Sequence, residues 1–134
     1  MAKHQIKKRI LLIDDEAGFA ALLRLNLEKT GDYEVQIENK GSKGFSAAQN
    51  FRPDLILLDV IMPDMDGGSV AALLKTDEAL REIPIIFLTA ILSTEESHVL
   101  GGTLAGYPCI PKPVSPEEVI ALIEECLLKN EQRG

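Results

Sequence analysis

Aromatic residues are scarce in this sequence: they make up 4% of its 134 residues, and tryptophan is absent. Because 46% of the residues are still hydrophobic, the interior must be built from aliphatic side chains. A chain of this length suits one domain, which buries roughly two thirds of its unfolded surface without disulfides or structural metals. We therefore expect one domain over residues 8–130, a flexible lead-in at 1–7 and a flexible tail at 131–134.

Basic residues are too few for a surface that binds nucleic acid. The formal net charge is −7, whereas such a surface needs a basic stripe to neutralise phosphates. The basic residues that do cluster are typical of a solvated lead-in; they are Lys3, Lys7, Lys8 and Arg9. We therefore expect no nucleic-acid partner.

Cysteine and long apolar runs are lacking as well. The two cysteines, Cys109 and Cys126, form no CxxC or His-rich pattern, so neither a disulfide framework nor a zinc site is expected. No apolar run approaches the roughly 20 residues that span a bilayer, and the first nine residues are too polar for a signal peptide. These absences predict a cytoplasmic protein with no membrane partner.

Short apolar runs alternate with helical patterns along the chain. The runs at 9–13, 54–58 and 84–88 are apolar throughout, which predicts strands buried on both faces, as in a parallel sheet covered by helices. Residues 33–38 alternate, which predicts a strand near a sheet edge. The segment 107–110 contains a proline that a central strand would not accept, so it is placed at the other edge.

Helical periodicity fills the gaps between these strands. The helical stretches are 17–29, 42–50, 68–75, 94–100 and a last helix that begins at Ser115 and frays from Lys129. In the last helix, Ser115, Pro116 and Glu118 form a capping box with proline at the first helical position. The pattern predicts an α/β fold with a five-stranded parallel sheet, flavodoxin-like strand order 2-1-3-4-5, and five helices covering both faces.

Polar residues follow the predicted strands at their carboxyl ends, where such sheets bind ligands. They are Asp14, Asp15, Glu16, Asp59, Thr89 and Lys112. Clustered carboxylates repel one another unless a cation offsets them, and Mg²⁺ prefers carboxylate and phosphate oxygens. An exposed carboxylate such as Asp59 can also attack an activated phosphate. Lys112 and the hydroxyl of Thr89 would then contact the phosphoryl oxygens.

Four motifs in this order resemble the receiver domains of response regulators, the CheY-like family. They are Ile10–Glu16, Pro53–Gly67, Pro84–Ala90 and Lys112–Pro113, and the resemblance covers roughly residues 8–128. It implies that Asp59 is the phosphorylation site. It also implies that Mg²⁺ is held by Asp14, Asp15, Asp59 and the backbone carbonyl of Ile61.

The resemblance further implies roles for two residues beyond the acidic ones. Thr89 would be the switch hydroxyl, and Lys112 would contact the phosphoryl group. The peptide bond between Lys112 and Pro113 is expected to be cis. The phosphoryl group would come from a sensor histidine kinase or a phosphotransfer protein. The protein would then act as a switch and not as an enzyme, catalysing only its own phosphotransfer and slow autodephosphorylation. The alternative is a degenerate receiver that binds partners without phosphorylation.

Output is expected through a downstream protein partner or a homodimer, on the face of helix 4, strand 5 and helix 5. Its residues would include Glu95, His98, Tyr107 and Cys109. The family usually has an aromatic ring at the position of Cys109. Tyr107 would lie on the same side of a regular strand, so whether a ring switch operates stays open.

Two further features bear on the chemistry. Aliphatic residues, Ile61 and Ile91, stand two positions after Asp59 and Thr89, which predicts slow self-dephosphorylation. An Asp-dependent phosphatase would need a second acid two residues after its nucleophile, and that position holds Ile61, so such an enzyme is disfavoured. The acidic residues after the first strand would repel the phosphate of a flavin, so a flavin-binding module is disfavoured.

Overall fold

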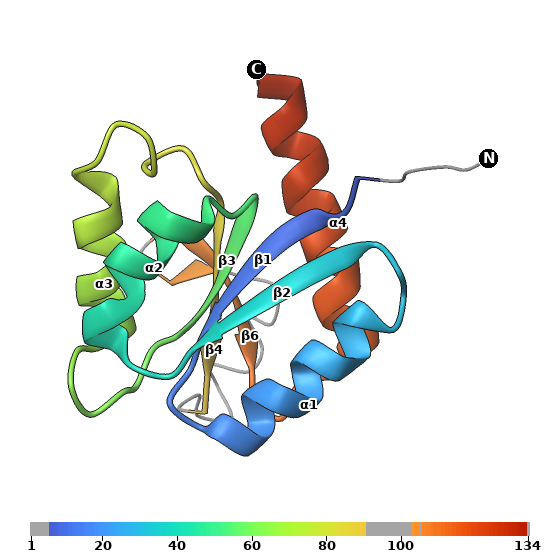
Figure 1. Ribbon diagram of the computed structural model, residues 1–134, viewed down its shortest axis with the longest axis horizontal. Coiled ribbons are helices and arrows are strands. Elements are labelled where there is room, and N and C mark those ends of the chain that lie inside the picture. The colour runs from blue at the N-terminus through green and yellow to red at the C-terminus, as the bar shows by residue number, and fades with distance from the viewer. Residues whose placement is uncertain (1–5, 91–102, 105, 134) are drawn as a thin grey trace.

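The computed structural model describes residues 6–90, 103–104 and 106–133. Its elements in chain order are β1 (Lys8–Ile13), α1 (Ala17–Glu28), β2 (Tyr33–Glu38), the 3₁₀ turn η1 (Gly41–Lys43), α2 (Gly44–Phe51), β3 (Leu55–Asp59), α3 (Gly67–Lys75), β4 (Ile85–Thr89), β5 (Thr103–Leu104), β6 (Tyr107–Pro111) and α4 (Pro116–Arg133). Strands and helices therefore alternate from β1 to β4, as expected from the sequence (Figure 1).

The strands form one sheet in the order β2-β1-β3-β4-β6-β5. The first five of these are parallel, which confirms the predicted order 2-1-3-4-5 with β6 as the fifth parallel strand. The order reverses between β1 and β3, whose carboxyl ends therefore lie side by side and leave a crevice for a ligand.

The prediction that the fifth parallel strand forms the sheet edge is wrong, because β5 pairs antiparallel with β6. Leu104 lies opposite Tyr107, and Gly106 has φ +87, a backbone conformation that glycine adopts at little cost in a tight turn. The parallel register with β4 begins only at Cys109. Pro108 therefore lies outside the β4 ladder, which is how the strand accommodates it.

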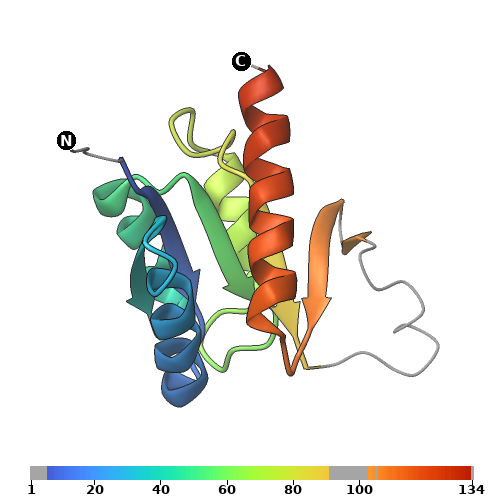
Figure 2. The same cartoon turned by 90° about the vertical axis from the view of Figure 1, so that its right-hand side faces the viewer.

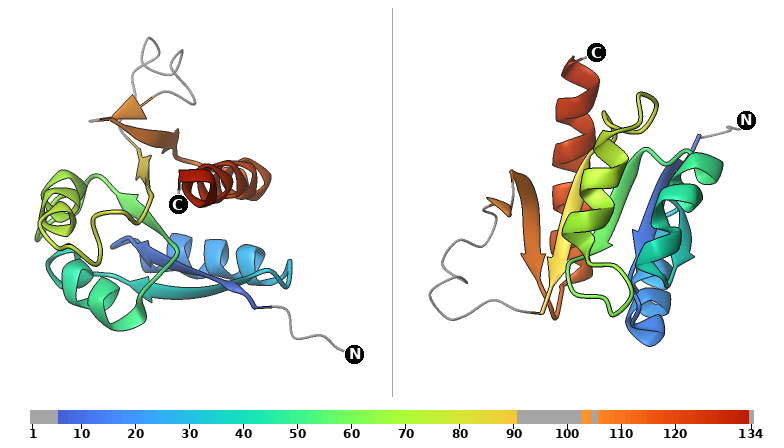
Figure 3. Two further views of the ribbon diagram at one scale, coloured as in Figure 1. Left: turned by 90° about the horizontal axis from the view of Figure 1, so that it is seen from above. Right: turned by 90° about the vertical axis from the view of Figure 1, so that its left-hand side faces the viewer.

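Helices cover both faces of the sheet, with α1 and α4 on one face and α2 and α3 on the other (Figures 1 and 3). Successive strand residues point to opposite faces. Accordingly, Ile10 and Leu12 pack in the core cluster beneath α1 and α4, whereas Leu11 and Ile13 pack in the cluster beneath α2 and α3. Among the largest fully buried side chains of the described residues, Phe87 is the one aromatic, so the core is aliphatic.

The described residues contain four α-helices, and the helix expected at 94–100 lies outside them. The last helix is longer than expected: α4 continues to Arg133 instead of fraying from Lys129, and it extends past the end of the sheet (Figure 2). An ion pair of 3.3 Å between Lys8 Nζ and Glu131 Oε2 joins it to β1. None of the described helices is long and apolar enough to cross a membrane.

Candidate functional site

Buried polar side chains gather at one rim of the sheet. In the described part of the chain, the polar or charged residues that are buried are Asp14, Asp59 and Thr89, with exposed fractions of 0%, 3% and 3%. Each stands at or directly after the carboxyl end of a parallel strand, respectively β1, β3 and β4. Burial of ionisable groups is costly unless partners or ligands offset it. The fold therefore concentrates its costly groups at the place where a ligand would bind.

Three carboxylates lie close together at this rim. One oxygen each from Asp14, Asp15 and Asp59 lies within 4.8 Å of the others, and Asp15 is exposed to solvent. Asp14 is fixed by three hydrogen bonds: its Oδ1 accepts the backbone N–H of Glu16 at 2.9 Å, its carbonyl accepts the side-chain amide of Asn39 at 2.8 Å, and its own N–H donates to the Glu38 carbonyl at 3.0 Å. The sequence prediction that these three carboxylates meet is therefore correct.

The acidic cluster fits a hard divalent cation. Asp14 Oδ2 is buried and, within the described residues, makes no hydrogen bond of good geometry; its neighbour is the Lys112 ammonium at 2.9 Å. A carboxylate oxygen in this state retains lone pairs for another ligand. Asp15 supplies a second oxygen from the solvent side. One buried and one exposed carboxylate beside Asp59 are the kind of oxygen set that Mg²⁺ takes together with phosphate and water.

The Asp59 carboxyl has a strongly altered acidity. Its pKa is raised from the usual 3.8 to about 7: burial, the nearby charge of Asp14 and a hydrogen bond with Asp15 raise it, whereas the Lys112 charge and the backbone N–H of Ile61 lower it. In the absence of a cation, Asp59 is thus partly protonated at neutral pH. A divalent cation bound here would displace that proton.

Lys112 is the cation of the site. Its Nζ lies 2.9 Å from Asp14 Oδ2 and 3.6 Å from Asp59 Oδ2, and it also pairs with Glu16 Oε1. Burial alone would lower the pKa of Lys112, but the hydrogen bond to Glu16 and the close carboxylates of Asp14 and Asp59 raise it above its ordinary value. The ammonium also lies 4.4 Å from the ring centroid of Phe19. Lys112 therefore stays charged.

The backbone places Lys112 beside β4, and the next bond has the expected geometry. The N–H of Lys112 donates to the carbonyl of Thr89 at 2.7 Å, which ties the end of β6 to the end of β4. The peptide bond between Lys112 and Pro113 is cis, as the resemblance implied. The lysine and the threonine predicted from sequence are thus neighbours in the fold.

The loop between β3 and α3, which carries Ile61, is fixed at both ends. The N–H of Gly67 donates to the carbonyl of Val60 at 2.8 Å. The Asp64 carboxylate accepts the backbone N–H groups of Gly41, Ser42 and Met65. A hydrogen bond from the Ser42 side chain, together with backbone hydrogen bonds, lowers the pKa of Asp64 to about 2. The loop is therefore attached to the segment after β2. Within this loop, the backbone N–H of Ile61 donates to the Asp59 carboxylate.

The predicted partner surface is described only in part. Tyr107 and Cys109 both pack on the face of α2 and α3, which confirms that they share one side of the strand. The ring of Tyr107 meets Phe87 edge to face, with centroids 5.5 Å apart, and burial raises the pKa of the Cys109 thiol. Glu95 and His98 lie outside the described residues, as does Ile91.

Three residues that contact the site were given no role from the sequence, although Glu16 was placed at this end of the sheet. Glu16 pairs with Lys112, Phe19 places its ring beneath the same ammonium, and Asn39 holds the carbonyl of Asp14. Glu16 directly follows the acidic pair, and Phe19 lies one helical turn further on, so their position was a usable signal. Asn39 had no signal other than being polar at the end of a strand.

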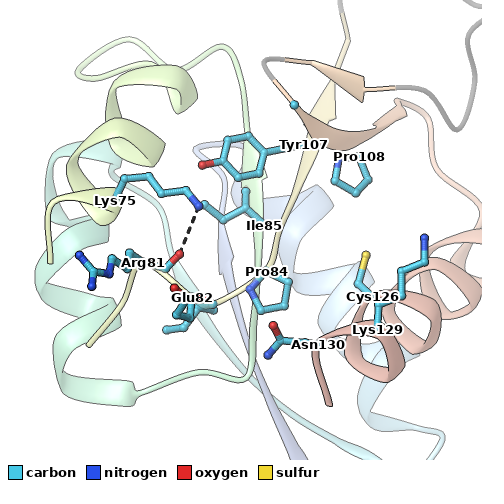
Figure 4. Close-up of a pocket in the computed structure, with 12 residues that line it drawn as sticks. Lys75, Arg81, Glu82, Pro84, Ile85, Tyr107, Pro108, Cys126, Lys129 and Asn130 are labelled. Atoms are coloured by element: carbon cyan, nitrogen blue, oxygen red, sulfur yellow. Dashed lines mark hydrogen bonds between the residues drawn. The ribbon is translucent and has the colours of Figure 1, made fainter. Parts of the chain in front are cut away.

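A cavity of about 500 Å³ lies at the opposite end of the sheet, where β4 and β6 begin (Figure 4). The Lys75 ammonium points into it, donates to the Arg81 carbonyl at 3.2 Å and lies 5.3 Å from the ring centroid of Tyr107. Cys126 of α4 lines the other side. None of the clustered carboxylates lines this cavity, so it is separate from the candidate site.

A family model described as the response regulator receiver domain matches residues 10–124. The chain therefore belongs to the receiver domains of response regulators, which act in two-component systems. Among solved structures, the receiver domain protein (CheY-like) from Methanospirillum hungatei has 33% sequence identity and a TM-score of 0.76, with 96% of this chain and 100% of that chain covered. The signal receiver domain of a signal transduction histidine kinase from Syntrophus aciditrophicus has 31% identity and a TM-score of 0.75, covering 95% and 94%.

Curated relatives are longer regulators. The chain is 37% identical over 126 residues to the alkaline phosphatase synthesis transcriptional regulatory protein PhoP of Bacillus subtilis. It is 36% identical over 124 residues to the DNA-binding dual master transcriptional regulator RpaA of Synechocystis. These alignments cover 94% and 92% of this chain but 51% of each relative. The chain thus spans about half the length of these relatives.

Proposed function

We propose that this receiver accepts a phosphoryl group on Asp59 and acts as a phosphorylation-dependent switch. The observation that carries the proposal is the meeting of three carboxylate oxygens within 4.8 Å, with the Lys112 ammonium 3.6 Å from Asp59. A buried nucleophile, a cation beside it and further oxygens around it are the elements that phosphoryl transfer to a carboxylate requires. The family membership agrees with this chemistry.

In the proposed reaction, an Asp59 oxygen attacks the phosphorus of a phosphorylated donor. The new O–P bond forms while the bond to the donor's leaving group breaks, and the leaving group takes up a proton. Lys112 and the Thr89 hydroxyl would pair with the phosphoryl oxygens. Asp14, Asp15, Asp59 and the Ile61 carbonyl would hold Mg²⁺, which when bound offsets the negative charge of the carboxylates and the phosphoryl group.

We propose a sensor histidine kinase or a phosphotransfer protein as the donor. A phosphorylated histidine is a good donor for this transfer, because its protonated ring leaves as neutral imidazole and no negative charge develops on the leaving nitrogen when the P–N bond breaks. The protein would turn over only its own phosphotransfer and a slow hydrolysis of the aspartyl phosphate. The alternative, a degenerate receiver that does not take phosphate, is disfavoured because the acidic cluster, Thr89 and Lys112 are all present.

For output, we propose phosphorylation-dependent binding of a protein partner or of a second copy. The surface would include Tyr107 and Cys109, together with Glu95 and His98. The net charge of −7 makes this domain itself a poor ligand for nucleic acid. The relatives PhoP and RpaA are named as transcriptional regulators, so regulation of transcription is a reasonable final output.

The proposal is tested by labelling with acetyl phosphate and Mg²⁺, read as an 80 Da mass gain that hydroxylamine removes. We expect wild type to gain one phosphoryl group and Asp59→Asn to gain none. Asp32→Asn is the control, since Asp32 is exposed in the turn before β2, at the amino end of the sheet. Equal labelling of wild type and Asp59→Asn, with both proteins folded by circular dichroism, would refute the assignment.

A further inference from the structure

Glu16 occupies the N-cap position of α1 but does not cap the helix. Its backbone is extended (φ −84, ψ 93), and its side chain makes no capping hydrogen bond. The carboxylate instead pairs with the Lys112 ammonium, 96 residues further along the chain. The side chains that cap helices well are the shorter ones of Ser, Thr, Asp and Asn, so a glutamate at this position has no strong local partner. The Glu16 carboxylate is therefore available for a contact across the site.

We propose that Glu16 is a positioning residue that holds Lys112 in the unphosphorylated protein and releases it to the phosphoryl group on Asp59. This inference rests on the proposed function of Asp59. In this arrangement Glu16 slows phosphorylation, because Lys112 must leave it before pairing fully with the phosphoryl oxygens. The start of α1 thereby becomes sensitive to the phosphorylation state.

Of the carboxylates around Lys112, Glu16 is the one that the lysine would release on phosphorylation. Its Nζ lies 2.9 Å from Asp14 but 3.6 Å from Asp59, which is too long for a good hydrogen bond. Asp14 is fully buried and held by three hydrogen bonds, so its position is fixed. The Glu16 side chain is 60% exposed. Solvent therefore stabilises the Glu16 carboxylate after it separates, and screening keeps its attraction to Lys112 weak.

Phe19 provides the surface on which the ammonium can move. Its ring centroid lies 4.4 Å from Lys112 Nζ, one turn of α1 beyond Glu16. The face of an aromatic ring attracts a cation without fixing the direction of its N–H groups. Lys112 can thus turn from Glu16 toward Asp59 while it keeps both the Phe19 contact and the Asp14 ion pair.

The charge balance of the rim points the same way. Among the described residues, the Lys112 ammonium contacts the carboxylates of Asp14 and Asp59, and Glu16 adds a third negative group around it. A phosphoryl group on Asp59 carries about two negative charges at neutral pH. It would therefore attract Lys112 more strongly than one solvated carboxylate does. Removal of the Glu16 charge makes Lys112 available before the donor arrives.

The test compares Glu16→Gln with wild type in the initial rate of acetyl phosphate labelling with Mg²⁺. We expect the variant to label about two- to fivefold faster, the range that matches loss of an exposed ion pair. Glu78→Gln, which removes one charge from an exposed residue on the turn after α3, should label at the wild-type rate. A Glu16→Gln rate equal to or below that of wild type would overturn the inference.

A second pair of proteins separates positioning from a simple change of charge. In a Lys112→Met background, Glu16→Gln should change the labelling rate by less than about half of its effect in wild type, because Lys112 is the group that Glu16 restrains. An undiminished effect would mean that Glu16 acts only through its charge and would overturn the inference.

The third measurement does not depend on phosphorylation. In protein labelled with ¹⁵N-lysine and free of donor, Glu16→Gln should shift the ammonium resonance of Lys112, and Glu78→Gln should not. An unchanged resonance would overturn the inference. Failure of wild type to label on Asp59 would instead overturn the proposed function, and with it the role of Glu16, so the two failures are distinguishable.

Discussion

Gly67 packs directly against the backbone carbonyl of Asp59. A Cβ added at Gly67 would overlap that oxygen and lie 2.9 Å from the Cα of Val60. Because both neighbours are backbone atoms, they cannot rotate away as a flexible side chain would. The first residue of α3 thus sets the position of Asp59, the proposed phosphoacceptor, at the end of β3.

We expect Gly67→Ala to lower the free energy of unfolding by about 1–3 kcal/mol, the usual cost of overpacking. It should also slow the labelling of the folded protein by acetyl phosphate, since Asp59 is displaced. Gly18→Ala is the control, because a Cβ there meets nothing within 4 Å. Urea unfolding and labelling check both effects. An unfolding free energy as high as that of wild type would contradict the packing argument.

The raised pKa of Asp59 makes stability depend on pH. Folding raises this pKa from 3.8 to about 7, so between these values the folded state holds a proton that the unfolded state has released. The contribution of Asp59 to the free energy of unfolding therefore falls as pH rises through this window. Above pH 7 the folded protein bears the full cost of holding an ionised, buried Asp59.

Asp59→Asn removes the cost of burying this negative charge. In protein free of divalent cations, we expect it to raise the free energy of unfolding at pH 8 by on the order of 2 kcal/mol, with little gain at pH 4. Urea unfolding at both pH values, with EDTA present, measures the difference. Asp32→Asn should show no such trend. A gain for Asp59→Asn that is the same at pH 4 and pH 8 would contradict the assignment of the pKa.

Magnesium should stabilise the folded protein through the acidic cluster. At a Mg²⁺ concentration ten times its Kd, the free energy of unfolding should rise by about 1.4 kcal/mol. Asp15→Asn should lose most of this gain but keep its fold, because Asp15 is exposed. Thermal unfolding with and without Mg²⁺ tests this, with Asp32→Asn as the control. An equal stabilisation by Mg²⁺ in wild type and Asp15→Asn would show that Asp15 is not a ligand of the metal.

The aspartyl phosphate should hydrolyse slowly, over minutes or longer. Ile61 follows Asp59 by two residues and its side chain is 52% exposed, so an aliphatic group borders the path of the attacking water. Ile61→Asn should shorten the lifetime severalfold, because an amide can orient that water. Leu128→Asn is the control, since Leu128 is similarly exposed at 56% but lies on α4. A wild-type lifetime of seconds would refute the prediction.

Much of the fold could be predicted because its local signals agree. The uninterrupted apolar run at 54–58 specified a strand buried on both faces, and the structure has β3 at Leu55–Asp59. The capping box at Ser115 placed the start of α4 correctly, and Glu118 N–H donates to the Ser115 hydroxyl at 3.2 Å. The far end of α4 was placed wrongly: the helix continues to Arg133 and Glu131 contacts Lys8 of β1, a long-range contact that no local pattern records.

The sheet edge was misplaced for a related reason. A proline in 107–110 argued for an edge strand, yet two residues of β5 pair outside β6. Proline is excluded only where the ladder needs its N–H, and the register with β4 starts one residue after Pro108. The decisive quantity was the register between strands, which is a property of the tertiary structure.

By itself, the sequence determined the strand and helix order, the aliphatic core and the polar residues at the strand ends. These follow from local periodicity and from the rule that parallel strands place their carboxyl ends on one rim. Only the tertiary structure decided how deeply Asp14 and Asp59 are buried, and therefore how far the pKa of Asp59 rises. It also decided that Glu16 pairs with Lys112, because side chains 96 residues apart meet only after the whole sheet has formed.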